Sequence, residues 1–111
     1  MSIAGDLIRG HTDAIILARL LQSDSYGYEI NKIVSTLSGG RFELKEATLY
    51  TAFKRLEQSG LITSYWGEDG PGARRRYYAI TEAGRRFWRE ARRDWEQTRA
   101  LLDALIFVEE D

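Results

Sequence analysis

Basic side chains are concentrated at two places in this sequence where they could bind phosphate. Three consecutive arginines, Arg74, Arg75 and Arg76, follow the turn-like stretch GEDGPGA and precede the apolar run YYAI. A second pair, Lys54 and Arg55, lies in a segment whose apolar residues recur at the helical period. Arginine and lysine on a rigid support are the side chains that contact the phosphates of nucleic acids. These residues therefore predict the recognition of a polyanion.

Catalytic and metal-binding chemistry would need residues that this chain lacks or has only once. There is no cysteine, and a nucleophile–histidine pair would depend on the single histidine, His11. The stretch GEDGPG lacks the lysine and the following Ser or Thr of a phosphate-binding P-loop. Glu68 and Asp69 supply too few ligands for a metal ion. We therefore expect a protein that is not an enzyme and has no cofactor or metal site, with His11 structural or at the surface.

The formal net charge of -1 conceals a strong asymmetry along the chain. Residues 41–93 contain 12 basic and 7 acidic side chains, a net charge of +5, whereas residues 94–111 contain 1 basic and 6 acidic, a net charge of -5. The overall charge therefore says little about what the middle segment binds. The +5 of that segment agrees with an acidic partner.

The remaining bulk properties indicate a helix-rich domain in the cytoplasm. A chain of 111 residues is most simply one domain with a core of its own. The first residues lack a charged region followed by a long apolar stretch, so we expect no secretory leader, and no run approaches the roughly 20 apolar residues of a membrane span. The absence of cysteine suits a reducing compartment.

Three segments carry apolar stripes at the 3.6-residue period and predict helices: HTDAIILARLLQSD, YGYEINKIVSTLSGG and KEATLYTAFKRLEQSG. Thr12 or Asp13 is expected to cap the first helix and Ser25 the second. Ile30, Ile33, Val34 and Leu37 form the stripe of the second helix, and the short stretch RFEL after it is a candidate strand. In the third helix the apolar stripe consists of Leu49, Ala52, Phe53 and Leu56.

A β-hairpin and a long helix complete the chain. The strands are LITSYW and RRRYYAI, joined by GEDGPGA. Strand alternation places Arg76 on the face of Tyr78, so we expect Arg74 and Arg75 to face solvent more than Arg76. Thr81 is expected to cap the last helix. Its apolar residues follow a heptad-like seam: Trp88, Ala91, Trp95, Thr98, Leu102 and Leu105.

Three helices followed by a hairpin predict a mainly α (α+β) fold of the winged helix-turn-helix type. A recognition helix buries one face and presents short polar and cationic side chains on the other, as the third helix does with Thr48, Thr51, Lys54 and Arg55. Tyr26 lies at the start of the second helix, where backbone amides can meet phosphate. We expect a DNA-binding domain over residues 1–80 and a dimerisation helix over residues 81–111.

The motifs DSYGYEI, EATLYTAFKRLEQSGLI and GARRRYYAITEAG resemble the PadR family of bacterial transcriptional regulators. The resemblance covers roughly Leu7 to Leu105, and the single C-terminal helix is similar to the short subfamily that includes regulators of multidrug efflux. It implies a homodimer that binds a palindromic promoter element, usually as a repressor, and is released by a small aromatic effector. In similar regulators a tryptophan at the position of Trp95 flanks a flat cavity between subunits.

The seam of the last helix is expected to be buried against a second copy or against the first helix, because two exposed tryptophans would favour aggregation. Our hypothesis is that Trp95, with Trp88 beside it, stacks planar ligands such as cationic dyes. The alternative for both tryptophans is that they serve only as interface core.

Two further alternatives concern the basic residues. The arginine block could be an edge that discourages strand aggregation, and Lys54 and Arg55 could be a solvated face held by acidic neighbours such as Glu57. The whole domain could be a winged-helix protein–protein interaction module that does not bind DNA. The concentration of positive charge on both helix and hairpin favours DNA over the last of these.

Overall fold

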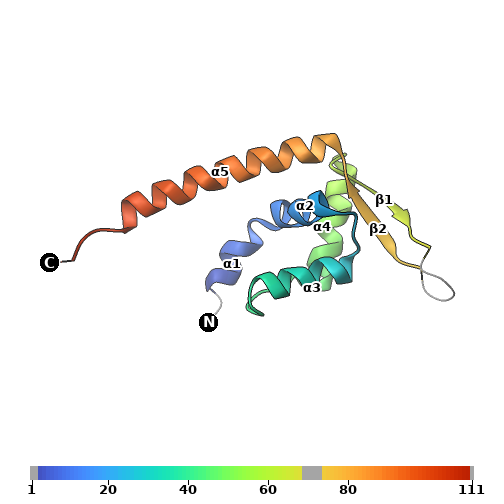
Figure 1. Ribbon diagram of the computed structural model, residues 1–111, viewed down its shortest axis with the longest axis horizontal. Helices are drawn as coiled ribbons and strands as arrows, with labels where there is room; N and C mark the ends of the chain where they lie inside the picture. The colour runs from blue at the N-terminus through green and yellow to red at the C-terminus, as the bar shows by residue number, and fades with distance from the viewer. Residues whose placement is uncertain (1–2, 69–73, 111) are drawn as a thin grey trace.

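The computed structural model describes residues 3–68 and 74–110, and within them the predicted mainly helical fold with one hairpin is confirmed. The helices and strands in chain order are α1 (Ile3–Arg9), α2 (Thr12–Gln22), α3 (Gly27–Leu37), α4 (Glu46–Gln58), β1 (Ile62–Trp66), β2 (Arg76–Ile80) and α5 (Glu82–Ile106). Figure 1 shows α2, α3 and α4 as a group beneath the first half of α5, with the hairpin projecting from one end.

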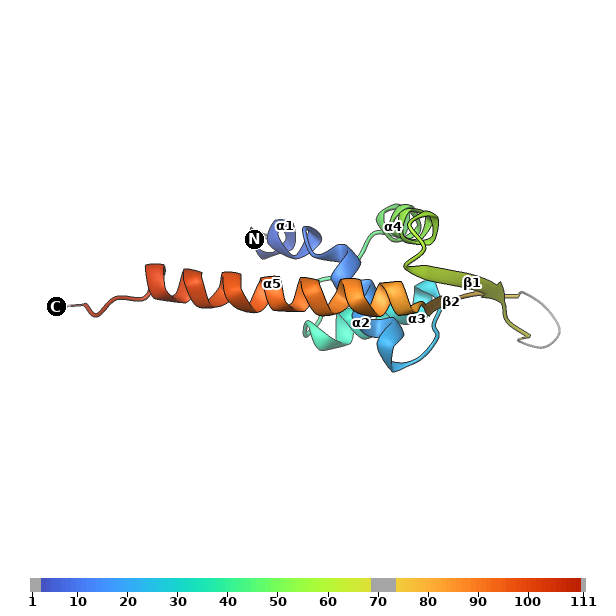
Figure 2. The same ribbon diagram turned by 90° about the horizontal axis from the view of Figure 1, so that it is seen from above.

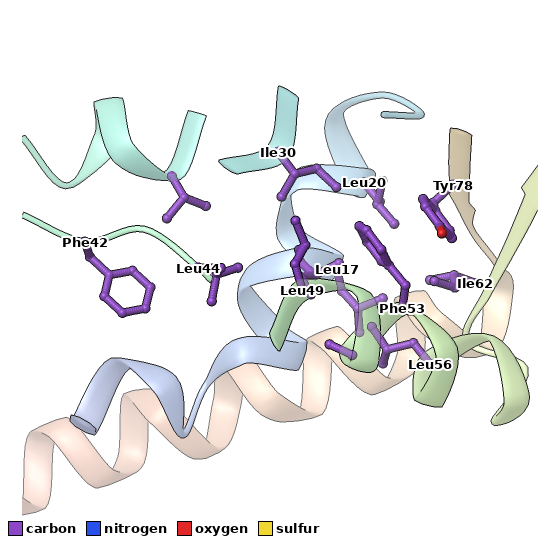
Figure 3. Close-up of a cluster of buried hydrophobic side chains, with 13 residues drawn as sticks. Leu17, Leu20, Ile30, Phe42, Leu44, Leu49, Phe53, Leu56, Ile62 and Tyr78 are labelled. Atoms are coloured by element: carbon purple, nitrogen blue, oxygen red, sulfur yellow. The ribbon is translucent and has the colours of Figure 1, made fainter. Parts of the chain in front are cut away.

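The core is built between α2, α3, α4 and the base of the hairpin (Figure 3). The predicted stripe of α4 is fully confirmed, since Leu49, Ala52, Phe53 and Leu56 are all buried. Phe53 stacks on Tyr78 of β2, with ring centroids 3.9 Å apart and planes inclined by 16°. Because burying each large side chain contributes about 1.5–3 kcal/mol, this contact fixes the hairpin to α4.

The hairpin is antiparallel and is also attached to the turn between α2 and α3. Its register runs from Ile62 opposite Ile80 to Trp66 opposite Arg76. Ser25 pairs with Tyr78 through two backbone hydrogen bonds of 3.1 and 2.8 Å. Residues 69–73 of the predicted turn GEDGPGA lie outside the described residues.

Helix α5 begins where predicted and runs far beyond the rest of the fold. The hydroxyl of Thr81 accepts a hydrogen bond of 3.0 Å from the amide of Gly84, which confirms the cap. Gly84 is buried so closely against the turn that precedes β1 that a Cβ there would lie 2.2 Å from the carbonyl oxygen of Leu61. Figure 2 shows the second half of α5 extending past the other helices, away from the hairpin.

Several sequence-based expectations at element ends were wrong. The additional helix α1 was not predicted, because its segment is short and lacks a clear apolar stripe. Ser25 does not cap α3, since Tyr26 is the N-cap and the backbone of Ser25 is used in pairing with β2. Neither Thr12 nor Asp13 caps α2. His11 is the N-cap, and the Thr12 hydroxyl instead donates a hydrogen bond of 2.7 Å to the Arg9 carbonyl.

The stretch RFEL is not a strand, although both of its apolar residues belong to the core. Phe42 and Leu44 are buried, and the side-chain amide of Asn31 satisfies both backbone groups of Leu44 at 2.7 and 2.8 Å. These side-chain bonds replace the partner strand that the stretch would have needed. Leu37, expected in the buried stripe of α3, is 68% exposed at the end of its helix.

Candidate nucleic-acid interface and apolar groove

The outward face of α4 carries the four predicted contact residues. Thr51, Lys54 and Arg55 are exposed and Thr48 is half-buried. Thr48, Thr51 and Arg55 line one side of a hollow of about 380 Å³, whose other side is formed by Arg9 and Thr12 from the α1–α2 junction. Hydroxyl and guanidinium groups thus gather on one surface, as contact with a nucleic-acid backbone or base edge requires.

Arg55 has an acidic neighbour that the sequence did not reveal. Its guanidinium forms an ion pair with the carboxylate of Asp13 on α2, 42 residues earlier in the chain. Both groups are partly exposed, so the pair contributes at most about 1 kcal/mol to stability. The pair orients Arg55 and reduces the net positive charge of this part of α4.

The three hairpin arginines are all exposed, and they divide by the ring on which each guanidinium lies. Arg74 lies with Arg76 on the ring of Trp66, at 5.6 and 5.3 Å from its centroid. Arg75 lies over the ring of Tyr26, 4.8 Å from its centroid. Arg74 lies two residues before Arg76, the first residue of β2, which is the spacing of side chains on one face of an extended chain.

A group of tyrosines supports Arg75 at the start of α3. The ring of Tyr77 meets Tyr26 edge-on at 5.3 Å and stacks with Tyr65 at 5.7 Å. The Tyr65 hydroxyl donates a hydrogen bond of 2.7 Å to the Asp24 carboxylate, and this bond raises the pKa of Tyr65 above its usual range. Tyr26 and Arg75 are thereby brought together next to the first backbone amides of α3, where an anion is favoured.

A second feature is an apolar groove of about 450 Å³ between α5 and the helices beneath it. Trp88, Ala91 and Trp95 line it from α5, opposite residues of α1, α2 and α3. Trp95 is 43% exposed and meets the ring of His11 edge-on, with centroids 5.1 Å apart. The structure thus brings both predicted effector residues to one groove, together with His11, which carried no sequence signal for this role.

The charged side chains at the groove are cationic. Arg19 and Arg92 line it, and none of the described lining residues is acidic. The guanidinium of Arg92 lies 5.6 Å from the centroid of the Trp88 ring and also pairs with Glu96 at 3.5 Å.

The second half of the α5 seam is exposed in the single chain. Leu102 is 44% and Leu105 69% exposed, Thr98 is exposed as well, and the neighbouring Leu101 and Ile106 add to the apolar surface. Exposed apolar residues gathered on one helix in this way are typical of interaction sites.

Within residues 3–68 and 74–110, His, Asp and Glu side chains do not gather in a group that would hold a metal ion. No helix in these ranges is both long and apolar enough to span a bilayer.

Comparison with known proteins agrees with this architecture. The chain is 42% identical to a transcriptional regulator from Clostridium thermocellum of solved structure, with a TM-score of 0.84 over 92% of this chain and 96% of that one. It is 35% identical to a PadR family transcription regulator from Clostridium difficile R20291, with a TM-score of 0.75 over 87% and 99% of the two chains. A protein of uncharacterised function from Lysinibacillus sphaericus is 40% identical over 96% of both chains.

The profile of the transcriptional regulator PadR-like family matches residues 16–90, which include α3, α4, the hairpin and the start of α5. This span contains the basic face of α4 and the hairpin arginines. The protein belongs to the PadR-like family of transcriptional regulators.

Proposed function

We propose that this DNA-binding regulator is a ligand-responsive repressor that recognises a palindromic promoter site as a homodimer. The observation that carries the proposal is the arrangement of α4 and the hairpin, which present polar and cationic side chains from two elements attached to one core. Thr48, Thr51 and Lys54 would enter the major groove, and Arg74 and Arg75 would contact flanking phosphates. Tyr26 would add a phosphate contact at the start of α3.

Salt dependence of binding to duplex DNA tests the interface. Affinity should fall by orders of magnitude between about 50 and 200 mM salt, because phosphate contacts release counterions. Replacing Arg74 and Arg75 together by alanine should reduce the slope of log K against log salt by about 2, since each contact contributes about 0.9. Arg99→Ala, on the projecting half of α5, is the matched control and should leave the slope unchanged. An unaltered slope in the double variant would exclude the hairpin from the interface.

The homodimer is supported by α5. An antiparallel pairing of two α5 helices would cover the exposed seam residues Leu102 and Leu105. It would also place residues 82–93, with 5 basic and 2 acidic side chains, against residues 94–106, with 1 basic and 3 acidic. Leu102→Glu should therefore produce monomers in sedimentation velocity, while Gln97→Glu, which adds the same charge off the seam, should not. Equal dimerisation of both variants would contradict the proposed interface.

The groove at Trp88 and Trp95 is the proposed effector site. Its aromatic walls suit a planar ring, whereas Arg19 and Arg92 favour an anionic substituent over a cationic one. Quenching of tryptophan fluorescence by naphthoate should therefore exceed quenching by naphthylmethylammonium, and Trp95→Leu should abolish both. If neither compound nor a planar cationic dye alters the fluorescence, Trp88 and Trp95 are interface core alone.

Repression and the palindrome are tested on promoter DNA. The purified protein should protect two symmetric half-sites in a footprint upstream of its own gene, and deleting the gene should raise expression of a reporter fused to that region. Increased expression with the protein present would identify an activator instead. A winged-helix module for protein partners predicts no salt-dependent DNA affinity, so the same titration separates the two functions.

A further inference from the structure

Trp66 occupies a position in the hairpin that packing does not explain. It is the last residue of β1, opposite Arg76 in the register, and its side chain is 51% exposed. It is absent from the buried core cluster and from the partly buried hydrophobic residues that pack against it. A large aromatic residue at the outer part of a hairpin therefore needs another reason for its position.

Two guanidinium groups lie on this ring. Those of Arg74 and Arg76 are 5.6 and 5.3 Å from its centroid, within the roughly 6 Å over which a cation–π attraction acts. Such a contact supplies no hydrogen-bond acceptor, so N–H donors of both arginines stay available to a phosphate. The ring thus restricts two long, flexible side chains without saturating the groups that would bind DNA.

The same assembly is connected to the recognition helix. Arg76 donates a hydrogen bond of 2.7 Å to the hydroxyl of Ser64. That hydroxyl in turn donates a hydrogen bond of 2.7 Å to the carboxylate of Glu57 on α4. The Trp66 assembly, defined by Trp66, Arg74 and Arg76, is therefore held at a set position relative to the face of α4.

We propose that Trp66 is a positioning residue for DNA binding, which holds Arg74 and Arg76 in place for phosphate contact before the DNA arrives. The inference rests on the proposed function and adds Arg76 to the contact set. Restricting side chains in their bound orientation increases affinity, because less conformational entropy is lost on association. Trp66 acts through the two arginines and makes no base contact, so its effect is the same on every DNA sequence.

A double-mutant cycle on duplex DNA tests the proposal. Trp66→Leu keeps an apolar side chain but removes the aromatic face, and it should lower affinity about 5- to 30-fold from the loss of two exposed cation–π contacts. In the Arg74→Ala/Arg76→Ala background the same change should alter affinity less than about two-fold. In the Arg75→Ala background it should keep its full effect, because Arg75 lies over Tyr26 instead. Trp66→Phe should recover part of the affinity.

The outcomes distinguish the positioning role of Trp66 from the phosphate contacts of Arg74 and Arg76. An equal effect of Trp66→Leu in all backgrounds, or no effect in the native one, overturns the positioning role while Arg74 and Arg76 remain contacts. Unchanged DNA affinity and salt slope in the Arg74→Ala/Arg76→Ala variant remove both arginines from the contact set and overturn the role of Trp66, whereas the salt slope of the Arg74→Ala/Arg75→Ala variant tests the hairpin separately. Urea unfolding monitors folding in parallel. A loss of affinity in Trp66→Leu that matches a loss of folded protein, without recovery in Trp66→Phe, also overturns the proposal.

Discussion

Replacing Gly84 by alanine tests how α5 is joined to the winged helix. A Cβ at this position would lie 2.2 Å from the carbonyl oxygen of Leu61 and 2.7 Å from Cγ1 of Ile80. Real Cβ contacts are essentially never that short, so either α5 or the Leu61 backbone must move. That carbonyl also accepts the 3.0 Å hydrogen bond from the amide of Thr81, which a shift would lengthen.

Three contributions determine how much Gly84→Ala changes the free energy of unfolding. Forcing a methyl group into a packed site costs about 1–3 kcal/mol. Weakening the Thr81–Leu61 hydrogen bond adds about 1 kcal/mol. Alanine gains about 1 kcal/mol over glycine through its helix propensity. We therefore expect Gly84→Ala to lower the free energy of unfolding by about 1–3 kcal/mol, opposite in sign to the effect of propensity alone.

Urea unfolding followed by circular dichroism measures this change at a fixed protomer concentration, which keeps any contribution of association constant. Ala100→Gly is the control, since Ala100 is exposed on the same helix and should show only the propensity difference of about 1 kcal/mol. If Gly84→Ala is as stable as the native protein or more so, the close approach of α5 to Leu61 is wrong and the reasoning fails.

Three further predictions concern the core and the basic face. Phe53→Ala should lower the free energy of unfolding in urea by about 3–5 kcal/mol, because it removes a buried ring that stacks on Tyr78, and a loss under 1 kcal/mol would contradict that packing. Burial raises the pKa of Tyr78 above its ordinary 10.0, so the folded state holds the phenolic proton more tightly; stability should be unaffected below about pH 10 and fall above it, and Tyr78→Phe should reduce that fall in alkaline urea titrations. Asp13→Ala should release Arg55 and raise the affinity for duplex DNA a few-fold in anisotropy titrations, whereas reduced affinity would show that the ion pair positions Arg55 for contact.

The fold was predictable where a local pattern determines it. The stripe of α4, the two strands and the Thr81 cap each follow from residues a few positions apart, so periodicity and capping rules find them. The end of α3 was not, because Leu37 has the spacing of a buried residue but is the last residue of its helix, where it lines the open groove and stays 68% exposed. Ser25 has the chemistry of a cap, and only the arrival of β2 beside it uses its backbone otherwise.

The candidate site shows the same division. Arg74, Arg75 and the outward residues of α4 could be identified from charge and helical spacing. The partnership of Arg55 with Asp13 joins residues 42 positions apart, and no local pattern reports it. Trp66 was detectable in principle, because the hairpin register places it opposite Arg76, but only after the length of the loop between the strands is known.

The double attachment of the hairpin has a consequence for how a signal could travel through this protein. The backbone of Ser25 holds Tyr78, and Asp24 holds Tyr65, so the hairpin cannot swing independently of the turn between α2 and α3. The reading head, defined as α3, α4 and the hairpin, should therefore move as one rigid body together with the start of α5, which Gly84 holds against Leu61. In the dimer proposed above, a ligand bound in the groove would change the spacing and tilt between the two reading heads and leave each of them intact. Two half-sites one helical turn of DNA apart, about 34 Å, would then no longer match the spacing of the two reading heads.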